Sequence, residues 1–440
     1  MRDRPLHLAL VVSCLAALTL GLFRLATPSV WVDEAATANA TGESYVSFMT
    51  DQYHWLYYTL IKPWASVFGT SEWALRLPSV LGTTLGCGLL VLLAYRLFGR
   101  WVALASGLLL ATSPFVIQWS QQARGYTMML ALTILATLLL VRALDKGTRW
   151  AWAVYGVALA AVVVWHPVGG FLILPAQLVL AYQRRDRVLP HGLLAAVIVC
   201  ALALPWAGQI GLRSTGQRAS INWLDAPSAD VAARALLDVS GAAGLGVLLG
   251  LLGLCVLWLR GERANAVWLG TWAFAPFAVS LAVSTVKPIF LDRYLLVSAP
   301  AFALLGGIAI ASAARRLRPV LVVAVAAVTL VGLVRWYDTS SDGNWRGEDW
   351  RSAVRTVLER KDDEDVVLVA QWSAHPAAEY YGARVTDVST APVIWVLRWT
   401  EGGRPLAVEE RSALGFGDHT MVEDLDFGSR LRAQRWVREP

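Results

Sequence analysis

Two adjacent carboxylates directly after the first long apolar segment are the residues best suited to chemistry. They are Asp33 and Glu34, in the stretch W-V-D-E-A. A charged side chain near hydrocarbon is costly, about 2.5 to 3.5 kcal/mol at a helix centre, so such residues tend to mark function. A carboxylate here can act as a general base on an attacking hydroxyl. Alternatively, the pair can be a solvated helix end, or it can be bonded to Arg76. Neighbouring side chains point in different directions, so we expect one of the two to face a site.

The same loop continues into D-Q-Y-H-W-L-Y-Y, which adds Asp51, His54 and several aromatic rings. His54 suits a metal ligand or a proton carrier, and equally an interfacial residue with satisfied hydrogen bonds. Trp55, Tyr57 and Tyr58 are typical both of the aromatic belt at a membrane surface and of a platform for a sugar. The residues alone leave these alternatives open.

Three cations follow apolar runs in Q-Q-A-R-G-Y and K-P-I-F-L-D-R-Y: Arg124, Lys287 and Arg293. They fall on the side of the membrane where few cations are expected, so they need another reason. Arginine suits a phosphate because its donors are planar and paired, and an anionic lipid headgroup is the alternative. His166, in W-H-P-V-G-G, is interpreted as a turn residue packed under the loop.

Long apolar runs must position these residues. The chain has 440 residues, of which 56% are hydrophobic and 16% charged, which is typical of a polytopic membrane protein. Runs able to span about 30 Å of hydrocarbon recur about eleven times. They lie near Leu6–Ala26, Leu77–Leu97, Trp101–Trp119, Tyr126–Leu144, Trp150–Trp165, Val168–Tyr182, Leu189–Gly208, Ala235–Leu259, Val267–Val286, Tyr294–Ala313 and Pro319–Trp336.

The loops between these runs differ in charge, and this predicts the orientation. Six alternate loops are rich in Lys and Arg, beginning with Arg2 and Arg4 and ending with Arg315, Arg316 and Arg318. The positive-inside rule places these loops and the N-terminus in the cytoplasm. The acidic loop and everything after Tyr337 are then outside. The net charge of +6 is explained by these loops and does not indicate nucleic acid.

The last hundred residues change character, with frequent charges and no long apolar run. The stretch E-D-W-R-S-A-V-R-T-V-L-E-R predicts an amphipathic helix with Trp350, Val354, Val357 and Leu358 on one face. D-V-V-L-V-A and V-I-W-V-L-R-W predict strands. We therefore expect a membrane module over residues 1–336, with its catalytic loop at 28–76, and a small soluble α/β domain outside the membrane over residues 337–440.

The four cysteines offer no metal or disulfide framework. Each lies inside an apolar run and no C-x-x-C spacing occurs, so they are interpreted as small core or lipid-facing residues. No closed metal-ligand set is recognisable in the sequence.

Several motifs together resemble the membrane-embedded GT-C glycosyltransferases. W-V-D-E-A after the first helix, Y-H-W-L-Y-Y, and F-G-T-S-E-W-A-L-R-L-P-S-V-L carry the resemblance. The nearest branch is the bacterial mannosyltransferase-like members of family 39, the protein O-mannosyltransferase and aminoarabinose-transferase group. Q-Q-A-R-G-Y, the W-H turn, K-P-I-F-L-D-R-Y-L-L and E-D-W-R-S-A-V fit the same pattern, so the resemblance extends over nearly the whole chain.

The resemblance implies transfer of a sugar from a polyprenyl-phosphate donor to a glycan, lipid or protein hydroxyl outside the cell, with inversion at the anomeric carbon. Mannose is the first candidate for the sugar. Asp33 matches the catalytic aspartate and Glu34 its neighbour. Asp51 and His54 match further polar residues, although H-W-L-Y-Y here lacks the prolines of the family's P-P-L-Y-like stretch. Arg124 and Arg293 would hold the phosphate with Lys287 assisting. The remaining expected substrate-binding residues are Tyr58, Tyr126, His166 and Tyr294.

The chemistry agrees with this reading. The leaving group is already a good anion, so it needs cations and not a general acid. No cofactor is expected to be required, although some GT-C branches use a divalent metal.

The central expectation is that Asp33 and Arg293 meet across one cavity on the outer side of the plasma membrane. A transporter or flippase of lipid-linked sugars is the alternative, and it would favour midplane charges and paired repeats. A membrane anchor for a binding module after Tyr337 is a third hypothesis.

Overall fold

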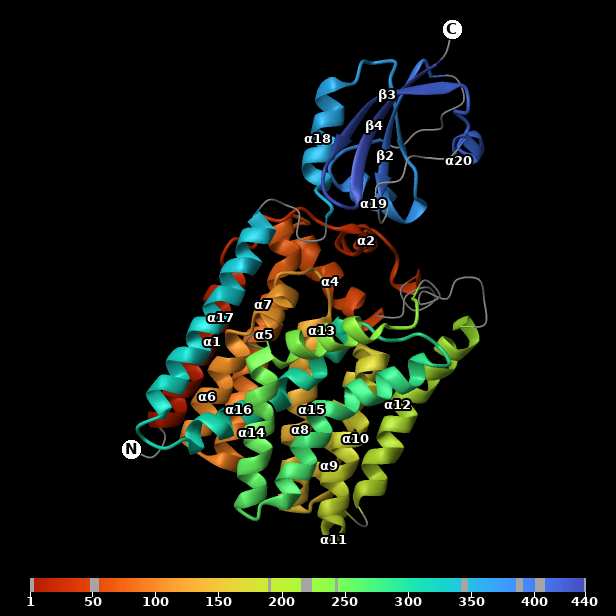
Figure 1. The fold of residues 1–440 in the computed structure, drawn as a ribbon. Helices are drawn as coiled ribbons and strands as arrows, with labels where there is room; N and C mark the ends of the chain where they lie inside the picture. Colours follow the sequence, from red (N-terminus) through yellow and green to blue (C-terminus); the bar gives the residue numbers. More distant parts are fainter. Residues whose placement is uncertain are drawn as a thin grey trace. The chain divides into compact units, whose positions relative to one another are not determined.

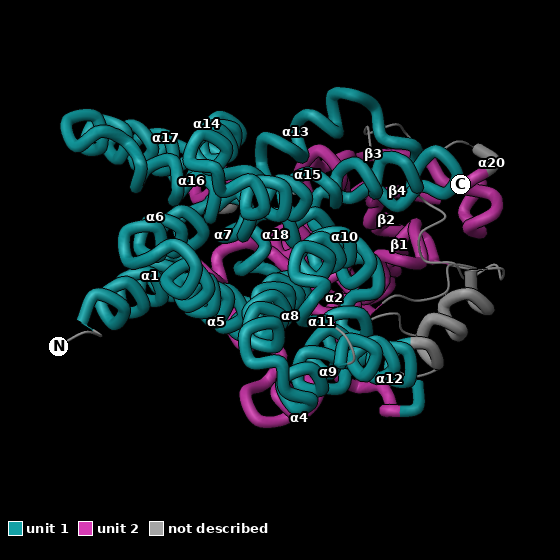
Figure 2. Tube along the Cα trace, turned by 90° about the horizontal axis from the view of Figure 1, so that it is seen from below, with its two compact units in different colours: residues 1–23, 46–59, 76–334 teal, residues 24–45, 60–75, 335–440 magenta. Residues whose placement is uncertain are grey.

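The structure, a computed structural model, describes residues 4–47, 55–188, 191–214, 224–241, 244–341, 347–384, 391–399 and 408–438. The chain divides into two compact units, which Figure 2 shows in different colours. The helical unit comprises residues 1–23, 46–59 and 76–334, and the sheet unit comprises residues 24–45, 60–75 and 335–440. The sequence placed the whole loop 28–76 in the membrane module, whereas 24–45 and 60–75 group with the C-terminal residues. The functional division at residue 336 stays a prediction.

Among the described residues, six helices are long and apolar enough to cross a bilayer. They are α1 (Arg4–Leu22), α5 (Glu72–Phe98), α8 (Tyr126–Lys146), α15 (Arg263–Ser284), η2 with α16 (Asp292–Ser298 and Ala299–Ser312) and α17 (Arg318–Ser341), all labelled or traceable in Figure 1. Each overlaps a span predicted from the sequence, because an apolar run of about 20 residues both forms a helix and matches the hydrocarbon thickness.

The other five predicted spans coincide with bent or shorter helices. Helices α6 (Arg100–Ala111) and α7 (Pro114–Ser120) meet at 58°, and α13 (Ala229–Ser240) and α14 (Leu245–Leu259) meet at 70°. The shorter helices are α9 (Arg149–Trp165), α10 (Pro167–Gln183) and the apolar part of α12 (His191–Ser214), with α11 (Arg185–Val188) between the last two. A 17-residue helix is only about 25 Å long. Length and composition within the described ranges thus give six spans, or up to eight with the bent pairs, and the count of eleven stays a prediction.

Helix α16 lies at the centre of the helical unit. It packs against α6, α14 and α15, and 89% of the residues in its apolar window are buried. The 3-10 helix η2, which leads into α16, contacts α8, α10, α13 and α15. Residues at the start of this span are therefore surrounded by helices from several parts of the chain.

The sheet unit contains a four-stranded sheet in the order β1-β2-β4-β3. Strands β1 (Val366–Val369) and β2 (Val393–Trp399) pair in parallel, with Val366 opposite Ile394. Strands β3 (His419–Asp426) and β4 (Leu431–Arg438) form an antiparallel hairpin, and β4 also pairs antiparallel with β2. The parallel pair requires a crossover, which includes η3 (Trp372–Ala374) and α19 (His375–Tyr380). The predicted small α/β domain is confirmed.

Helix α18 (Trp350–Arg360) covers one face of this sheet (Figure 1). Its buried side is Trp350, Ala353, Val354 and Val357, the spacing of one helix face. The prediction for Leu358 is wrong, because that residue is 38% exposed and Ala353 takes its place in the core. The opposite face of the sheet is covered by a second cluster around Ile394, Phe416 and Trp436, next to α20 (Val408–Ala413).

Two segments from early in the chain complete the sheet unit. Helix α2 (Val32–Ala40) packs against α19, and Val30, Val32 and Ala35 belong to the same hydrophobic cluster as Trp350 and the inner residues of β1 and β2. The other segment is the C-terminal half of α4 (Trp55–Phe68) with the first turn of α5. The helix that carries Asp33 and Glu34 is therefore part of the core of the C-terminal domain.

Candidate active site

Arg293 is the centre of an aromatic cluster in the helical unit. It lies in η2 and is only 7% exposed. Its guanidinium carbon lies 5.9 Å from the ring centres of Trp119, Tyr126 and Tyr294. Cations within about 6 Å of aromatic faces are attracted by the ring quadrupole. The rings keep the Arg293 charge in a desolvated environment, where its interaction with an anion is stronger than in water.

Arg124 belongs to the same cluster because it also lies next to the Tyr126 ring. Its guanidinium carbon also lies 5.9 Å from the Tyr126 ring, and its Nη1 donates to the Tyr58 hydroxyl at 3.2 Å. The structure thus brings two arginines to one buried tyrosine. Two planar cations in one partly desolvated place are suited to an anion with several oxygens, such as a phosphate.

The turn that carries Arg124 is fixed by Ser79 of α5, Trp165 of α9 and its own Gln121. Gln121 Nε2 donates to the carbonyl of Phe23 at 2.7 Å. Ser79 Oγ donates to the carbonyl of Arg124 at 2.9 Å, and Trp165 Nε1 donates to the carbonyl of Gly125 at 2.7 Å. The hydrogen bonds to the carbonyls of Arg124 and Gly125 fix the point on the turn after α7 from which the Arg124 side chain extends.

His166 has a structural role that the geometry makes explicit. It precedes Pro167 at the start of α10, is buried, and its Nδ1 accepts a hydrogen bond from the amide of Gly169 at 3.0 Å. Because Nδ1 accepts, the proton of a neutral ring is on Nε2. The ring also lies 4.7 Å from Tyr294 and 5.6 Å from Tyr126. His166 is both a helix cap and a wall of the aromatic cluster.

The carboxylate pair lies in the first turn of α2 in the sheet unit. Glu34 is fully buried and Asp33 is half-buried, so the two neighbours occupy different environments. Carboxylates in a first turn also complement the partial positive charge of a helix N-terminus. Asp33 and Arg293 thus belong to different units, and their meeting in one cavity stays a prediction.

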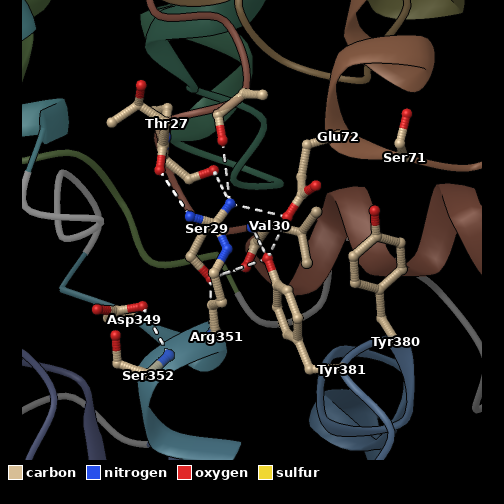
Figure 3. A network of polar contacts seen from close by, with 12 residues as sticks. Thr27, Ser29, Val30, Ser71, Glu72, Asp349, Arg351, Ser352, Tyr380 and Tyr381 are labelled. Atoms are coloured by element: carbon tan, nitrogen blue, oxygen red, sulfur yellow. Dashed lines mark hydrogen bonds and ion pairs between the residues drawn. The ribbon is translucent and has the colours of Figure 1, made fainter. Parts of the chain in front are cut away.

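Arg351 holds the segment that leads into α2. Figure 3 shows its guanidinium next to this segment, with Nη1 donating to the carbonyl of Thr27 at 2.9 Å and Nη2 donating to that of Ala26 at 3.0 Å. Nη2 also forms an ion pair with Glu72 at 2.8 Å. The position of Arg351 is set by α18, whose N-cap is Asp349. The Asp349 carboxylate accepts from the amide of Ser352 at 3.1 Å.

Tyr381 and Glu348 bind the same segment closer to Asp33. The Tyr381 hydroxyl accepts from the amide of Val30 at 2.8 Å and donates to Glu72 at 2.9 Å (Figure 3). Glu348 Oε2 accepts from the amide of Val32 at 3.3 Å. We call Glu72, Glu348, Arg351 and Tyr381 the clamp. Burial is the main cause that raises the pKa of Tyr381 to about 12, so its hydroxyl is protonated at neutral pH.

A cavity of about 550 Å³ lies in the sheet unit beside α2. Ala35, Ala38 and Asn39 form its α2 wall, and Glu379, Tyr380 and Tyr381 face them from around α19. Asp33 precedes Ala35 by two positions, about 200° around the helix. The Asp33 side chain therefore leaves α2 on a different face from the one that lines this cavity.

The described contacts do not join the remaining predicted site residues to the aromatic cluster around Arg293 or to the clamp. Lys287 lies half-buried in the turn after α15. Asp51 and His54 lie outside the described residues. Sequence reasoning missed Trp119, whose signal is its position two residues before Q-Q-A-R-G-Y. It also missed the roles of the clamp residues, although Glu72, Glu348 and Arg351 lie in the quoted motifs.

Within the described ranges, no three His, Cys, Asp or Glu side chains are grouped as ligands for a metal ion. Metal dependence stays an untested prediction.

Residues 55–208 match the family model described as dolichyl-phosphate-mannose-protein mannosyltransferase. The undecaprenyl phosphate-alpha-4-amino-4-deoxy-L-arabinose arabinosyl transferase of Pseudomonas savastanoi pv. phaseolicola is 37% identical over 164 residues, which are 34% of this chain and 30% of the relative. The chain thus matches less than a third of that relative's length.

Solved structures match over far more of the chain. ArnT from Cupriavidus metallidurans matches over 97% of both chains with a TM-score of 0.66 and 15% identity, and its structure bound to undecaprenyl phosphate gives a TM-score of 0.65. The oligosaccharyltransferase of Archaeoglobus fulgidus matches over 88% of this chain and 64% of its own, with a TM-score of 0.59 and 12% identity.

These matches define a multi-pass membrane protein with the ArnT-like GT-C fold and a small C-terminal sheet domain. Within that class, the resemblance to the GT-C glycosyltransferases that the sequence motifs carry agrees with the family model over residues 55–208 and with the 164-residue match to the arabinosyl transferase. The solved structures share the fold.

Proposed function

We propose that this protein is an inverting glycosyltransferase that moves a sugar from a polyprenyl-phosphate donor to a hydroxyl group in the cell envelope, on the outer face of the membrane. The mannosyltransferase family match, the aminoarabinosyl transferase relative and the ArnT structure with undecaprenyl phosphate support this class of donor. Mannose is the first sugar to test, and aminoarabinose is the second. A glycan, a lipid or a protein would provide the acceptor hydroxyl.

The observation that carries the proposal is the pair of arginines around Tyr126. In the transfer step the acceptor oxygen bonds to the anomeric carbon while the bond from that carbon to the phosphate oxygen breaks. The phosphate leaves as a monoester and gains negative charge. Arg124 and Arg293, held at 5.9 Å from the same ring, would stabilise that charge in the transition state.

Asp33 would accept the proton of the acceptor hydroxyl. A single in-line displacement inverts the anomeric carbon, as in inverting glycosidases, where a carboxylate also activates the attacking oxygen. The good leaving group removes the need for a general acid, so one carboxylate and the arginines are sufficient. Glu34, fully buried next to it, would support the position of α2.

The test is sugar transfer from a radiolabelled polyprenyl-phosphate donor by the purified full-length protein in membrane mimetic. Asp33→Asn should lower kcat by about 10² to 10⁴-fold, the usual contribution of a general base. The control is Asp426→Asn, an equal change at an exposed carboxylate on β3, which should leave transfer unchanged. Transfer by Asp33→Asn at the wild-type rate would show that the base assignment is wrong.

A further inference from the structure

We propose that the clamp acts as a set of positioning residues: Arg351, Tyr381 and Glu348 of the C-terminal region fix the start of α2, and thereby the place of the Asp33 carboxylate. This inference rests on the proposed function, because it assigns the sheet unit a part in the same transfer reaction. It gives Glu348, Arg351 and Tyr381 the task of placing the proposed base.

The first step is that the clamp binds the backbone, not only side chains. Residues 26–31 precede α2 and are not in a regular helix or strand, so their carbonyl and amide groups need partners from elsewhere. Arg351 donates to the carbonyls of three consecutive residues, Ala26, Thr27 and Pro28, at 2.9 to 3.3 Å. A guanidinium is suited to this because it presents five donors in a fixed plane.

The second step is that the contacts continue up to the residue before Asp33. The Arg351 amide donates to Ser29 Oγ at 3.2 Å. The amide of Val30 donates to Tyr381 and the amide of Val32 donates to Glu348. Almost every residue from 26 to 32 thus forms a hydrogen bond with the clamp, and these bonds fix the position at which α2 begins.

The third step is that packing fixes the rotation of α2. Val30, Val32 and Ala35 are buried in the cluster that contains Trp350 of α18. Trp350 Nε1 also donates to Glu348 Oε2 at 3.2 Å, so the apolar and polar contacts are linked. With Val32 and Ala35 turned into this core, the direction in which Asp33 leaves the helix is determined.

The clamp also gives a physical reason for two motifs. Glu72 lies in F-G-T-S-E-W-A-L-R-L-P-S, and Glu348 and Arg351 lie in E-D-W-R-S-A-V. The two stretches are 279 residues apart and meet in the Arg351–Glu72 ion pair, where the Glu72 side chain is only 18% exposed. Neither motif contains the expected base or the expected phosphate ligands.

The consequence is a specific kinetic effect. A displacement of about 1 Å in a reacting group can lower the rate about 10²-fold. Loss of the clamp should therefore lower kcat while KM for the donor, which the helical unit would bind, stays close to wild type. A domain that only supports folding would reduce the amount of folded protein and leave kcat per folded molecule unchanged.

The experiment uses two variants with matched controls in the full-length protein. Arg351→Met is compared with Arg432→Met, which removes an arginine from the same unit where it pairs with Asp424 and Asp426. Tyr381→Phe is compared with Tyr380→Phe, whose hydroxyl donates to the carbonyl of Thr70. Transfer kinetics are measured with the radiolabelled polyprenyl-phosphate sugar, and hydrogen exchange is measured over residues 24–40.

The expected result is a roughly 10- to 100-fold lower kcat for Arg351→Met with donor KM changed less than about threefold, and a smaller loss for Tyr381→Phe. Arg351→Lys should recover only part of the rate because an ammonium lacks the planar fork. Exchange over residues 24–40 should accelerate in both clamp variants and in neither control.

Two outcomes would overturn the positioning role, and they are separate from failure of the proposed function. Wild-type kcat in Arg351→Met, together with a loss in Asp33→Asn, would reject the clamp and keep the base. Equal exchange over residues 24–40 in Arg351→Met and Arg432→Met would reject it without any activity measurement. Full transfer by Asp33→Asn would instead reject the base assignment, whatever the exchange data show.

Discussion

Glu72 and Arg351 form an ion pair at 2.8 Å although Glu72 is the first residue of α5 and Arg351 lies in the first turn of α18, 279 residues further along the chain. Their side chains are 18% and 39% exposed, and Tyr381 donates to the same carboxylate oxygen. The first turn of α5, the turn after α19 and the start of α18 are therefore joined at one carboxylate. This three-way junction explains why segments 24–45 and 60–75 belong to the sheet unit.

The first prediction concerns the stability of this junction. Arg351→Met should destabilise the sheet unit by about 1–3 kcal/mol, because it leaves Glu72 and several backbone carbonyls without a charged donor. Glu72→Gln should destabilise it by a similar amount, and the double variant should lose less than the sum, since both changes disrupt one interaction. Thermal unfolding of the purified single and double variants, monitored by hydrogen exchange of α18, measures the coupling free energy between Glu72 and Arg351. Strict additivity would show that the ion pair is not an energetic unit.

The matched control is the exposed pair of Arg360 and Glu423 on the same sheet unit, whose side chains are 49% and 35% exposed. Removing either member should change stability by at most about 1 kcal/mol, as is usual for surface ion pairs.

The second prediction is a loss of stability of the sheet unit at alkaline pH. Burial is the main cause that raises the pKa of Tyr381 to about 12, whereas an unfolded tyrosine has a pKa of ~10. The folded state therefore holds this proton more tightly. Its contribution is complete below pH ~10 and is lost as the pH rises from about 10 to about 12, and it amounts to roughly 2–3 kcal/mol.

Tyr381→Phe removes this contribution, so the difference in unfolding free energy between wild type and variant should shrink over the same pH interval. Tyr380→Phe serves as the control, because the other tyrosines titrate equally in both proteins. A difference that is constant from pH 9 to 12 would contradict the prediction.

Local hydrophobic pattern was sufficient for most of the fold. The six long helices and strands β1 and β2 were predicted because each contains a long apolar run, which is typical of a membrane span or of a strand in a core. Strands β3 and β4 were missed because they mix apolar and charged residues without a regular alternation, as in T-M-V-E-D-L-D, and β3 exposes every second residue. Leu358 was misplaced because it lies at one margin of the apolar stripe of α18 and is 38% exposed, whereas Ala353 is buried at the other margin.

The candidate site was predicted in parts. Arg124, Tyr126, His166, Arg293 and Tyr294 stand out because each is a polar or aromatic residue at the end of an apolar run, and the structure brings these five together. The clamp could not be predicted in the same way. Its hydrogen bonds connect residues 279 to 351 positions apart, and no local period or spacing specifies contacts at that separation.

The third prediction separates the two roles of His166. His166→Ala removes the acceptor for the Gly169 amide and should destabilise the helical unit by about 0.5–2 kcal/mol, the usual cost of losing an N-cap. His166→Asn supplies another capping oxygen and should restore most of that stability. Stability is measured by thermal unfolding in detergent and transfer by the radiolabelled donor assay.

If the ring serves only as a cap, His166→Asn should transfer sugar at close to the wild-type rate. A stable His166→Asn protein with kcat reduced tenfold or more would show that the imidazole itself takes part in binding or transfer.

The last prediction addresses the two arginines that share Tyr126. If both stabilise the leaving phosphate, Arg293→Lys should lower kcat/KM by about 10²-fold, since a point charge replaces a planar pair of donors. Arg124→Lys should have a smaller effect, because Arg124 is less buried than Arg293 and its charge is better screened. Arg234→Lys on α13, where the arginine is exposed and pairs with Asp230, is the control.

Inhibition by polyprenyl phosphate, the expected product, should weaken in Arg293→Lys alongside the loss of rate, because the same guanidinium would hold the monoester. Unchanged product inhibition with a reduced rate would place Arg293 away from the phosphate and assign its effect to the packing of Trp119, Tyr126 and Tyr294 around it.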